Sequence, residues 1–252
     1  MKKLFNTLLT SLMFIGCTLP PLAIENDAQS QSVNTILICA KQIDIFQLRI
    51  NGAKPPKEAF EYYLKKVKKY TTNNIVVHKP LNLNLEKEKI NDFIQHYGEG
   101  SIKLQHLSKE DVPKFVHFAK EANEKKSSIV MIYTPELLAS WNKERKLRGL
   151  AFTHSNKTNI VAYNAVNINN APVITDTQAW KIVLTHEVGH RFHVPAKKDH
   201  NKMGHCTSRE CVMYARPDWQ TVVSVLFNGM PYDFCDKCKA ELKEAKKRCN
   251  LY

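Results

Sequence analysis

The sequence predicts an α/β (α+β) fold: an N-terminal lobe with a mixed sheet against helices, then a smaller, mostly helical C-terminal lobe. Short β-branched runs alternate with segments whose apolar residues recur every three or four positions, which is the pattern of strands and amphipathic helices in one layered core. A helical segment with paired histidines follows, and two close pairs of cysteines lie near the C-terminal end. These features together predict one domain built around polar, chemistry-bearing side chains.

The strands are predicted from short apolar runs bounded by turn-forming or polar residues. The predicted strands are Thr35–Ala40, Ile75–Val77, Ile129–Tyr133, Gly149–Thr153 and Asn159–Asn164. Pro135 follows the third run and stops it, and the last two runs lie on either side of a polar turn.

Three helices are predicted between these strands, because apolar residues recur there at helical spacing. The three apolar stripes are Phe60, Tyr63, Leu64 and Val67; Ile90, Phe93, Ile94 and Tyr97; and Val112, Phe115, Val116 and Ala119. Gly98 ends the second helix, and Ser108 can cap the third. In the C-terminal lobe, residues 219–226 predict a core-facing helix, and Glu241–Arg248 predicts a Lys-rich, solvated helix.

The first residues predict export. A positive start at residues 1–3 precedes an apolar stretch over residues 4–16, which is too short to span a bilayer but typical of a signal peptide. Gly16-Cys17 resembles a bacterial lipobox, so Cys17 is a candidate for lipidation and membrane anchoring; cleavage near Ala23 with soluble export is the alternative. The predicted location is the bacterial cell envelope or periplasm, or the medium outside the cell.

The predicted organisation after the signal is simple. Residues 17–32 read as a polar tether, and residues 33–252 as a single domain with lobes at 33–193 and 194–252. The formal net charge is +13, but the lysines are spread along the whole chain and no nucleic-acid-binding motif accompanies them. A lysine-rich, solvated surface is therefore the prediction, and nucleic acid is not an expected partner. The oligomeric state is not predicted.

A helix is predicted from about residue 179 to 192, with Asp176 or Thr177 as its cap. Leu184 and Val188 lie four residues apart on one face, which we expect to pack against the core.

His186 and His190 lie on a different face of this helix. Their four-residue spacing places them about 6 Å apart, one turn along the helix, which suits two nitrogen ligands of one Zn²⁺. Glu187 is poorly placed as a ligand, but its carboxylate can reach a metal-bound water and act as a general base. This helix is therefore the predicted active-site helix.

A third ligand is required, and the spacing leaves its identity open. His193, His200 and His205 are the candidates. His193 is poorly placed while the helix continues, because it lies about 10 Å of helical rise from His186. Pro195 stops the helix nearby, so the chain must turn back before either of the other two can approach.

Seven cysteines form a second pattern. Four of them make two close pairs, the usual layout of a Cys₄ structural zinc site: Cys206 and Cys211, then Cys235 and Cys238. Two disulfides are the alternative, which an oxidising compartment would favour. A Cys-x-x-Cys disulfide is usually redox-active rather than structural, and this favours zinc. Cys39 and Cys249 are left as a candidate disulfide that ties the ends of the domain together.

The stretch from His186 to Met213, with the later Cys-x-x-Cys, resembles the archaemetzincins of the metzincin clan. Their pattern is His-Glu-x-x-His-x-x-Gly-x-x-His-Cys, four residues, Cys, one residue, Met, and a later Cys-x-x-Cys. His205-Cys206, Cys211 and Met213 reproduce the middle of this pattern at its own spacing.

The resemblance implies a metzincin-like fold with a zinc-stapled C-terminal lobe. It implies that His186, His190 and His205 bind the catalytic zinc, with Glu187 as the base and Met213 as the Met-turn residue beneath the metal. It also implies a peptide or protein substrate lying along an edge strand within Gly149–Asn164.

Two departures from the family pattern are visible. His193 stands where the family has its turn glycine, and about nine extra residues, Pro195–Gly204, precede His205. Such a turn needs a left-handed backbone, which histidine tolerates better than most residues. The extra length keeps His200 as a rival third ligand.

The predicted function is zinc-dependent hydrolysis of peptide bonds, with one catalytic and one structural zinc per chain. The alternative is a zinc-stabilised binding or structural lipoprotein of the envelope that has lost catalysis.

Overall fold

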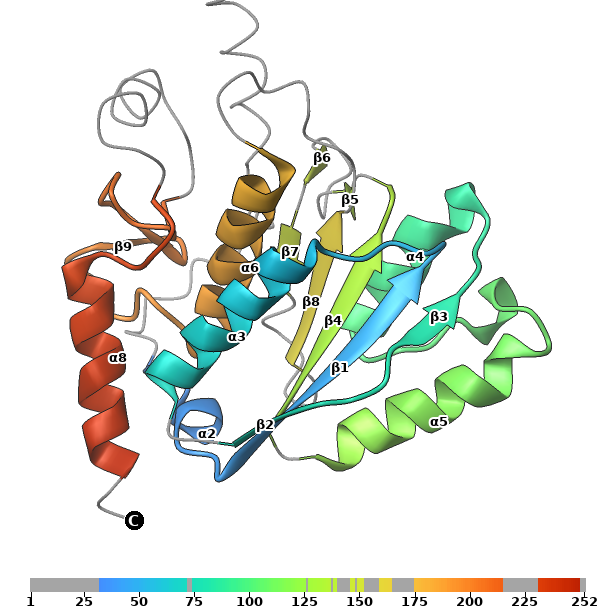
Figure 1. Ribbon diagram of the computed structural model, residues 1–252, viewed down its shortest axis with the longest axis horizontal. Helices are drawn as coiled ribbons and strands as arrows, with labels where there is room; N and C mark the ends of the chain where they lie inside the picture. The colour runs from blue at the N-terminus through green and yellow to red at the C-terminus, as the bar shows by residue number, and fades with distance from the viewer. Residues whose placement is uncertain are drawn as a thin grey trace, which may run out of the picture.

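The computed structural model describes residues 32–71, 74–125, 127–136, 138–139, 146–147, 149–151, 159–164, 175–214 and 231–249. Within them a mixed sheet lies between two layers of helices (Figure 1). Several predicted features lie outside the described residues: the signal peptide, Cys17, most of the tether, the turn between the last two predicted strands, and the helix at residues 219–226.

The main sheet has the strand order β2-β1-β4-β8-β7, and β3 also pairs with β1. The strands are β1 (Gln42–Ile50), β2 (Asn74–Val77), β3 (Leu81–Leu83), β4 (Ser128–Thr134), β7 (Gly149–Ala151) and β8 (Asn159–Asn164). All pairs are parallel except β7 with β8, which is antiparallel and places β7 at an edge. The predicted mixed sheet is confirmed.

Helices cover both faces of this sheet. They are α2 (Thr35–Ile38), α3 (Lys57–Tyr70), α4 (Lys87–Gly98), α5 (Asp111–Glu124), α6 (Asp176–Phe192) and α8 (Asp236–Arg248). In β1, Ile43 and Ile45 belong to the core shared with α3 and α6, whereas Phe46 and Leu48 belong to the core shared with α4 and α5. This alternation follows from the two-residue period of a strand. A short 3-10 helix, η1 (Leu104–His106), lies between α4 and α5. Two short antiparallel strand pairs complete the described elements: β5 (Leu138–Ala139) with β6 (Lys146–Leu147), and β9 (Asn201–Lys202) with β10 (His205–Cys206).

The strand predicted at Thr35–Ala40 is wrong, because this segment begins with the one-turn helix α2. Asn34 caps the helix, and its Oδ1 accepts a hydrogen bond from the Leu37 N–H at 3.2 Å. The cap satisfies a free backbone donor and favours a helical turn over extended chain. In α5, Val116 is 44% exposed, so its predicted place in the core stripe is also wrong.

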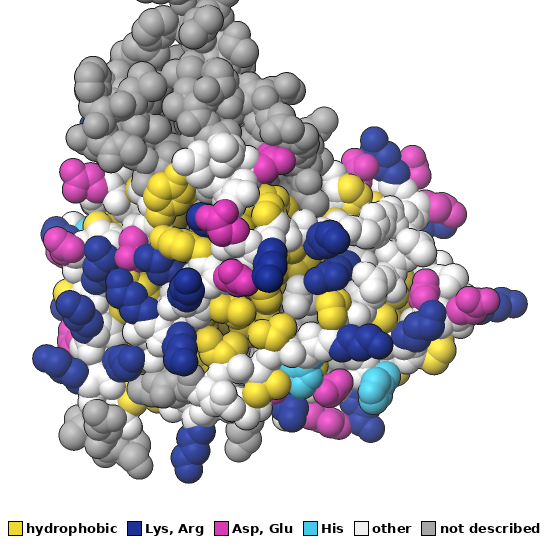
Figure 2. Space-filling view, in the orientation of Figure 1, with side chains coloured by type: hydrophobic (Ala, Val, Ile, Leu, Met, Phe, Trp, Pro, Cys, Tyr) yellow, Lys and Arg dark blue, Asp and Glu magenta, His cyan; other side chains and the backbone are white. Residues whose placement is uncertain are grey.

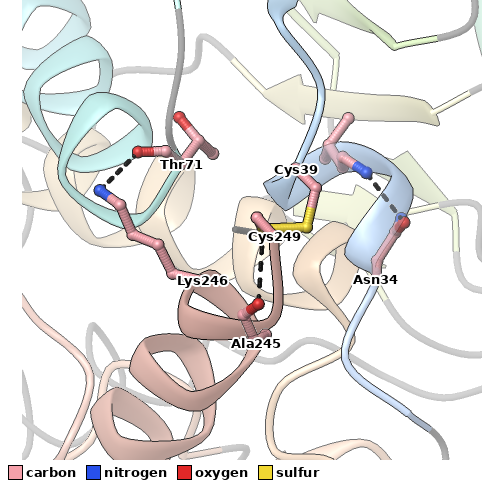
Figure 3. The surroundings of a disulfide bond; sticks show 7 residues. Asn34, Cys39, Thr71, Ala245, Lys246 and Cys249 are labelled. Carbon is pink, nitrogen blue, oxygen red and sulfur yellow. Dashed lines mark hydrogen bonds between the residues drawn. A yellow bond between two sulfur atoms is a disulfide. The ribbon is translucent and has the colours of Figure 1, made fainter. Parts of the chain in front are cut away.

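The ends of the described chain meet beside the C-terminal end of α6. The Asn34 N–H donates to Phe192 O at 3.0 Å, and the Asn34 side chain donates to Arg191 O at 2.9 Å. Cys39 and Cys249 form the predicted disulfide, with their Cα atoms 5.1 Å apart (Figure 3). The predicted link between the ends of the domain is therefore confirmed.

Helix α6 begins one residue earlier than the predicted caps allow. Thr175 is the cap: its hydroxyl accepts from Gln178 N–H at 3.2 Å, and the Gln178 side chain accepts from Thr175 N–H at 2.8 Å. This reciprocal pair satisfies two backbone donors, which a lone Asp176 cap would not. The helix packs against α3, β7 and β8, so every residue from Ala179 to its end is buried except Lys181.

The surface agrees with the predicted distribution of charge. On the face in Figure 2, Lys and Arg side chains are interspersed with Asp and Glu across the molecule. Among the described residues, no helix is long and apolar enough to cross a membrane.

Candidate metal centres

Three histidines converge at the C-terminal half of α6. His186 and His190 come from the helix, and His205 comes from the first residue of β10. Their donor atoms all lie within 4.8 Å of one another, and the Nε2 atoms of His186 and His190 are 3.2 Å apart. We refer to these residues as the three-histidine cluster. The structure therefore brings His205 to the helical pair.

Main-chain carbonyls orient two of these rings. His186 donates from Nδ1 to Val212 O at 2.7 Å, and His205 donates from Nδ1 to Met203 O at 3.1 Å. Because Nδ1 carries the proton, Nε2 of each neutral ring keeps a lone pair directed into the cluster. His205 Nε2 is buried and has no hydrogen-bond partner among the described residues. A buried nitrogen without a partner is expected where a metal ion would be bound.

Burial keeps the cluster neutral. It lowers the pKa of His186 to about 3 and that of His205 to about 4, and it holds the pKa of His190 well below the usual histidine range. The neighbouring histidines lower the pKa values of His186 and His190 further. Neutral imidazole is the form that binds metals, so the cluster is ready for a cation at neutral pH.

The spacing of the nitrogens also suits a metal ion. Tetrahedral zinc with bonds of about 2.0–2.1 Å holds its nitrogen ligands about 3.3 Å apart, close to the 3.2 Å between His186 and His190. Three imidazoles leave the fourth position of such an ion open. The residues present therefore fit a zinc ion of the catalytic type.

The two rival histidines lie elsewhere. His193 follows the last helical residue with φ 56° and ψ 45°, the left-handed conformation expected of the family's turn glycine, and it does not join the cluster. His200 lies within 4.8 Å of Cys238 and Glu241 instead. Of the candidates for a third ligand, the structure brings only His205 to the pair.

Glu187 is buried within α6, with 2% of its surface exposed. It follows His186 directly and precedes His190 on the same helix.

Gly189 is a residue of the site that was not predicted from the sequence. A Cβ atom at this position would overlap Met213 Sδ and lie 2.8 Å from Phe234 Cε1. Met213 is fully buried and therefore packs directly against the bare backbone of α6 between the two helical histidines. The role of Met213 as the Met-turn residue stays a prediction. A glycine inside a predicted buried helix was the signal that could have revealed the close approach.

This contact predicts a measurable coupling. Gly189→Ala is expected to destabilise the protein by about 1–3 kcal/mol, since overpacking outweighs the gain in helix propensity of about 1 kcal/mol. Met213→Ala is expected to cost about 2–5 kcal/mol through the cavity it leaves. The double variant should lose less stability than the two single variants together, because the alanine methyl group at position 189 occupies part of the cavity left by Met213. Urea unfolding of the three variants tests this, and strict additivity would contradict it.

Four cysteines form a second cluster beside the first. All four sulfurs lie within 4.8 Å of one another; the Cys206–Cys235 and Cys211–Cys238 sulfur distances are 3.6 and 3.8 Å. Tetrahedral zinc with bonds of about 2.3 Å sets sulfurs about 3.8 Å apart, whereas a disulfide needs about 2.05 Å. The four are free thiols, so the alternative of two disulfides is not found.

The charges in this four-cysteine cluster are strongly coupled. The pKa of Cys206 is lowered to about 2, because the thiols of Cys211 and Cys238 donate hydrogen bonds to its sulfur. The same hydrogen bonds raise the pKa values of Cys211 and Cys238. Holding all four residues as thiolates therefore requires a cation, which fits a structural metal site.

The two clusters share one segment of chain. His205 is followed directly by Cys206, whose N–H donates to Met213 O at 2.9 Å. Val212, which accepts the hydrogen bond from His186, lies between Cys211 and Met213, and its N–H donates to Asp233 O at 2.9 Å. The position of the three-histidine cluster thus depends on how the cysteine-bearing segments are held.

No family model matches the chain, and no curated protein matches it either. Among solved structures, the chain is similar to the archaemetzincin from Methanopyrus kandleri, with TM-score 0.49 and 17% identity over 83% of this chain and 98% of the other. It is also similar to the archaemetzincin from Archaeoglobus fulgidus, crystallised with malonate, with TM-score 0.40 and 15% identity over 79% and 99% of the two chains. Both carry the family name that the motif predicted. The chemistry of each centre must still be judged from its own donor atoms.

Proposed function

We propose that this chain is a zinc-dependent peptidase whose catalytic ion is held by His186, His190 and His205, with Glu187 as general base. The observation that carries the proposal is the convergence of three buried, neutral imidazoles from α6 and β10. The spacing of the two helical nitrogens fits one zinc ion, and three protein ligands would leave one of its four positions for water.

Each group in the site has a defined task. Zinc bound with one open position supplies a Lewis acid and lowers the pKa of a coordinated water. Glu187 accepts a proton from the attacking water and returns it to the leaving amine. The carbonyls of Val212 and Met203 hold the His186 and His205 rings in one tautomer and orientation.

We propose that the substrate is a peptide or protein segment that binds in extended form. Strand β7 lies at one edge of the main sheet and close to α6. An edge strand offers unpaired main-chain groups, to which an extended peptide can add as a further strand.

We further propose that Cys206, Cys211, Cys235 and Cys238 bind a second, structural zinc. The sulfur distances and the need for a compensating cation support this role. Export is supported by the Cys39–Cys249 disulfide, which is typical of an oxidising compartment. A lipid on Cys17 remains a prediction from the sequence.

Neither departure from the family pattern supports loss of the catalytic site. His193 takes the left-handed conformation that the turn requires, and the insertion still leaves His205 beside the helical pair. These observations favour the peptidase over the inactive, zinc-stabilised binding protein.

The test is the zinc content of the purified protein, measured by mass spectrometry, for the native chain and three variants. The native chain is expected to contain two zinc ions. His205→Ala should release one of them and Cys235→Ser the other, whereas His193→Gly, which restores the family residue, should retain both. One zinc in the native chain, or an unchanged content in His205→Ala, would overturn this assignment.

A further inference from the structure

A buried carboxylate lies on the helix that was predicted to be solvated. Glu241 is 3% exposed, in the middle of the lysine-rich α8. The predicted solvated character of this helix is wrong on the face formed by Glu241, Leu242 and Ala245, which are all buried. Burying a carboxylate is costly unless its oxygens find hydrogen-bond donors. Here Oε2 accepts from Ala196 N–H at 2.9 Å, and Oε1 accepts from Lys197 N–H at 2.7 Å.

Both donors belong to the insertion at residues 195–204, which is the main departure of this chain from the family pattern. The insertion leads into a small hairpin, in which Lys202 pairs with His205 and Asn201 with Cys206. The Asn201 side chain donates to Pro195 O at 2.5 Å and accepts from Gly204 N–H at 2.8 Å, so it closes the loop on itself. His205 stands at the start of the returning strand.

His200 lies beside the same attachment, although its Nε2 makes no hydrogen bond among the described residues. Its ring is 2% exposed, its Nε2 lies 3.6 Å from Glu241 Oε1, and its carbonyl accepts from Thr207 N–H at 3.0 Å. The histidine that the sequence offered as a rival ligand therefore lies between α8 and the strand that carries His205.

We propose that Glu241 is a positioning residue for the three-histidine cluster. Its hydrogen bonds hold the insertion against α8, and the position of the insertion determines the position of His205 in the cluster. The inference rests on the proposed function in one respect, namely that the three-histidine cluster binds a metal ion. Outer groups that orient a metal ligand change metal affinity by about 10- to 100-fold, which sets the size of the expected effect.

Glu244 provides a matched control. It lies one turn further along α8 and pairs with Lys197 Nζ at 3.4 Å, but this pair is exposed, with 55% of the Glu244 side chain accessible. Exposed pairs of this kind contribute little. Glu241→Gln and Glu244→Gln therefore change the same helix and the same insertion by the same chemistry, and differ in burial. In Glu241→Gln, one amide N–H₂ would face a backbone N–H that now has a carboxylate oxygen.

The experiment is a Co²⁺ titration of the metal-free, full-length protein in a competing chelator. Charge-transfer absorption from sulfur reports the four-cysteine cluster separately from the histidine site. Glu241→Gln is expected to weaken Co²⁺ binding at the three-histidine cluster about tenfold or more. The thiolate site should change much less, although the Glu241 carboxylate lies within 4.8 Å of the Cys238 sulfur. Glu244→Gln should match the native protein at both sites. Asn201→Ala, which opens the insertion without touching α8, should weaken the histidine site in the same way.

The outcomes separate the two proposals. Native affinity at the histidine site in Glu241→Gln would overturn the positioning role and leave the proposed function intact. Equal weakening at both sites would also overturn it, because Glu241 would then only stabilise the lobe. If the native protein binds no Co²⁺ at the three-histidine cluster, the proposed function fails, and the positioning role fails with it.

Discussion

Glu187→Ala is expected to retain both zinc ions and to lose about 10²–10⁴-fold in kcat on any peptide that the native protein cleaves. Three imidazoles already supply the ligands that the proposed catalytic zinc needs, so removing the carboxylate takes no ligand from the ion. What is lost is the base that accepts the proton from water and returns it to the amine.

A peptide-library screen with the native protein comes first, followed by single-turnover rates and zinc content for the variants. Glu187→Gln is the closest control, because it keeps the shape of the buried side chain and removes only its basicity. It should be as inactive as Glu187→Ala and as stable as the native protein. His205→Ala should be inactive for a different reason, which its lower zinc content would show. Turnover retained in Glu187→Ala would rule out the mechanism.

The periodic parts of this fold could be predicted from the sequence because each is specified locally. Apolar residues at helical spacing correctly predicted α3, α4 and α5, and β-branched runs predicted β2 and β4. The strand predicted at Thr35–Ala40 was wrong because the Asn34 cap favours a helical turn against the strand propensity of this β-branched run. Docking of Asn34 on the end of α6, a contact across more than 150 residues, then selects the helix.

The candidate site could be predicted only as far as its ligands follow a fixed spacing. His186 and His190 lie on one helical face, and the cysteine pairs have the spacing of a zinc site. Spacing could not choose among His193, His200 and His205, because the choice depends on how the insertion folds back. Glu241 gave no signal at all, since its partners are main-chain N–H groups some 45 positions away.

Cys238→Ser is expected to cause the largest loss of stability of the changes considered. A structural zinc site contributes about 10–16 kcal/mol in small zinc domains, which is comparable with the whole stability of a typical domain, about 5–15 kcal/mol. Cys238 is fully buried and anchors α8 to the segment that carries Cys206 and Cys211. Losing half of this contribution, about 5–8 kcal/mol, would lower the melting temperature by roughly 10–30 °C.

Loss of the disulfide gives the matched comparison. The double variant Cys39→Ser with Cys249→Ser is expected to cost about 2–5 kcal/mol and to keep both zinc ions, because the disulfide lies at the opposite end of α8 from Cys238. Thermal unfolding and zinc content together distinguish the two changes. A Cys238→Ser protein with native zinc content and melting temperature would contradict a structural metal site.

The two variants should also differ in which residues lose their protection from hydrogen exchange. In Cys238→Ser, hydrogen exchange should accelerate first in residues 201–214 and 231–249, because the four-cysteine cluster joins these two segments. Strands β1 and β4 should keep their protection from exchange, because they lie within the two hydrophobic cores. Since His205 and the Val212 carbonyl lie inside the first of these segments, the histidine site should bind metal more weakly even though none of its ligands has changed. Uniform acceleration across the whole chain would mean that the four-cysteine cluster supports the fold in general and does not specifically stabilise the three-histidine cluster.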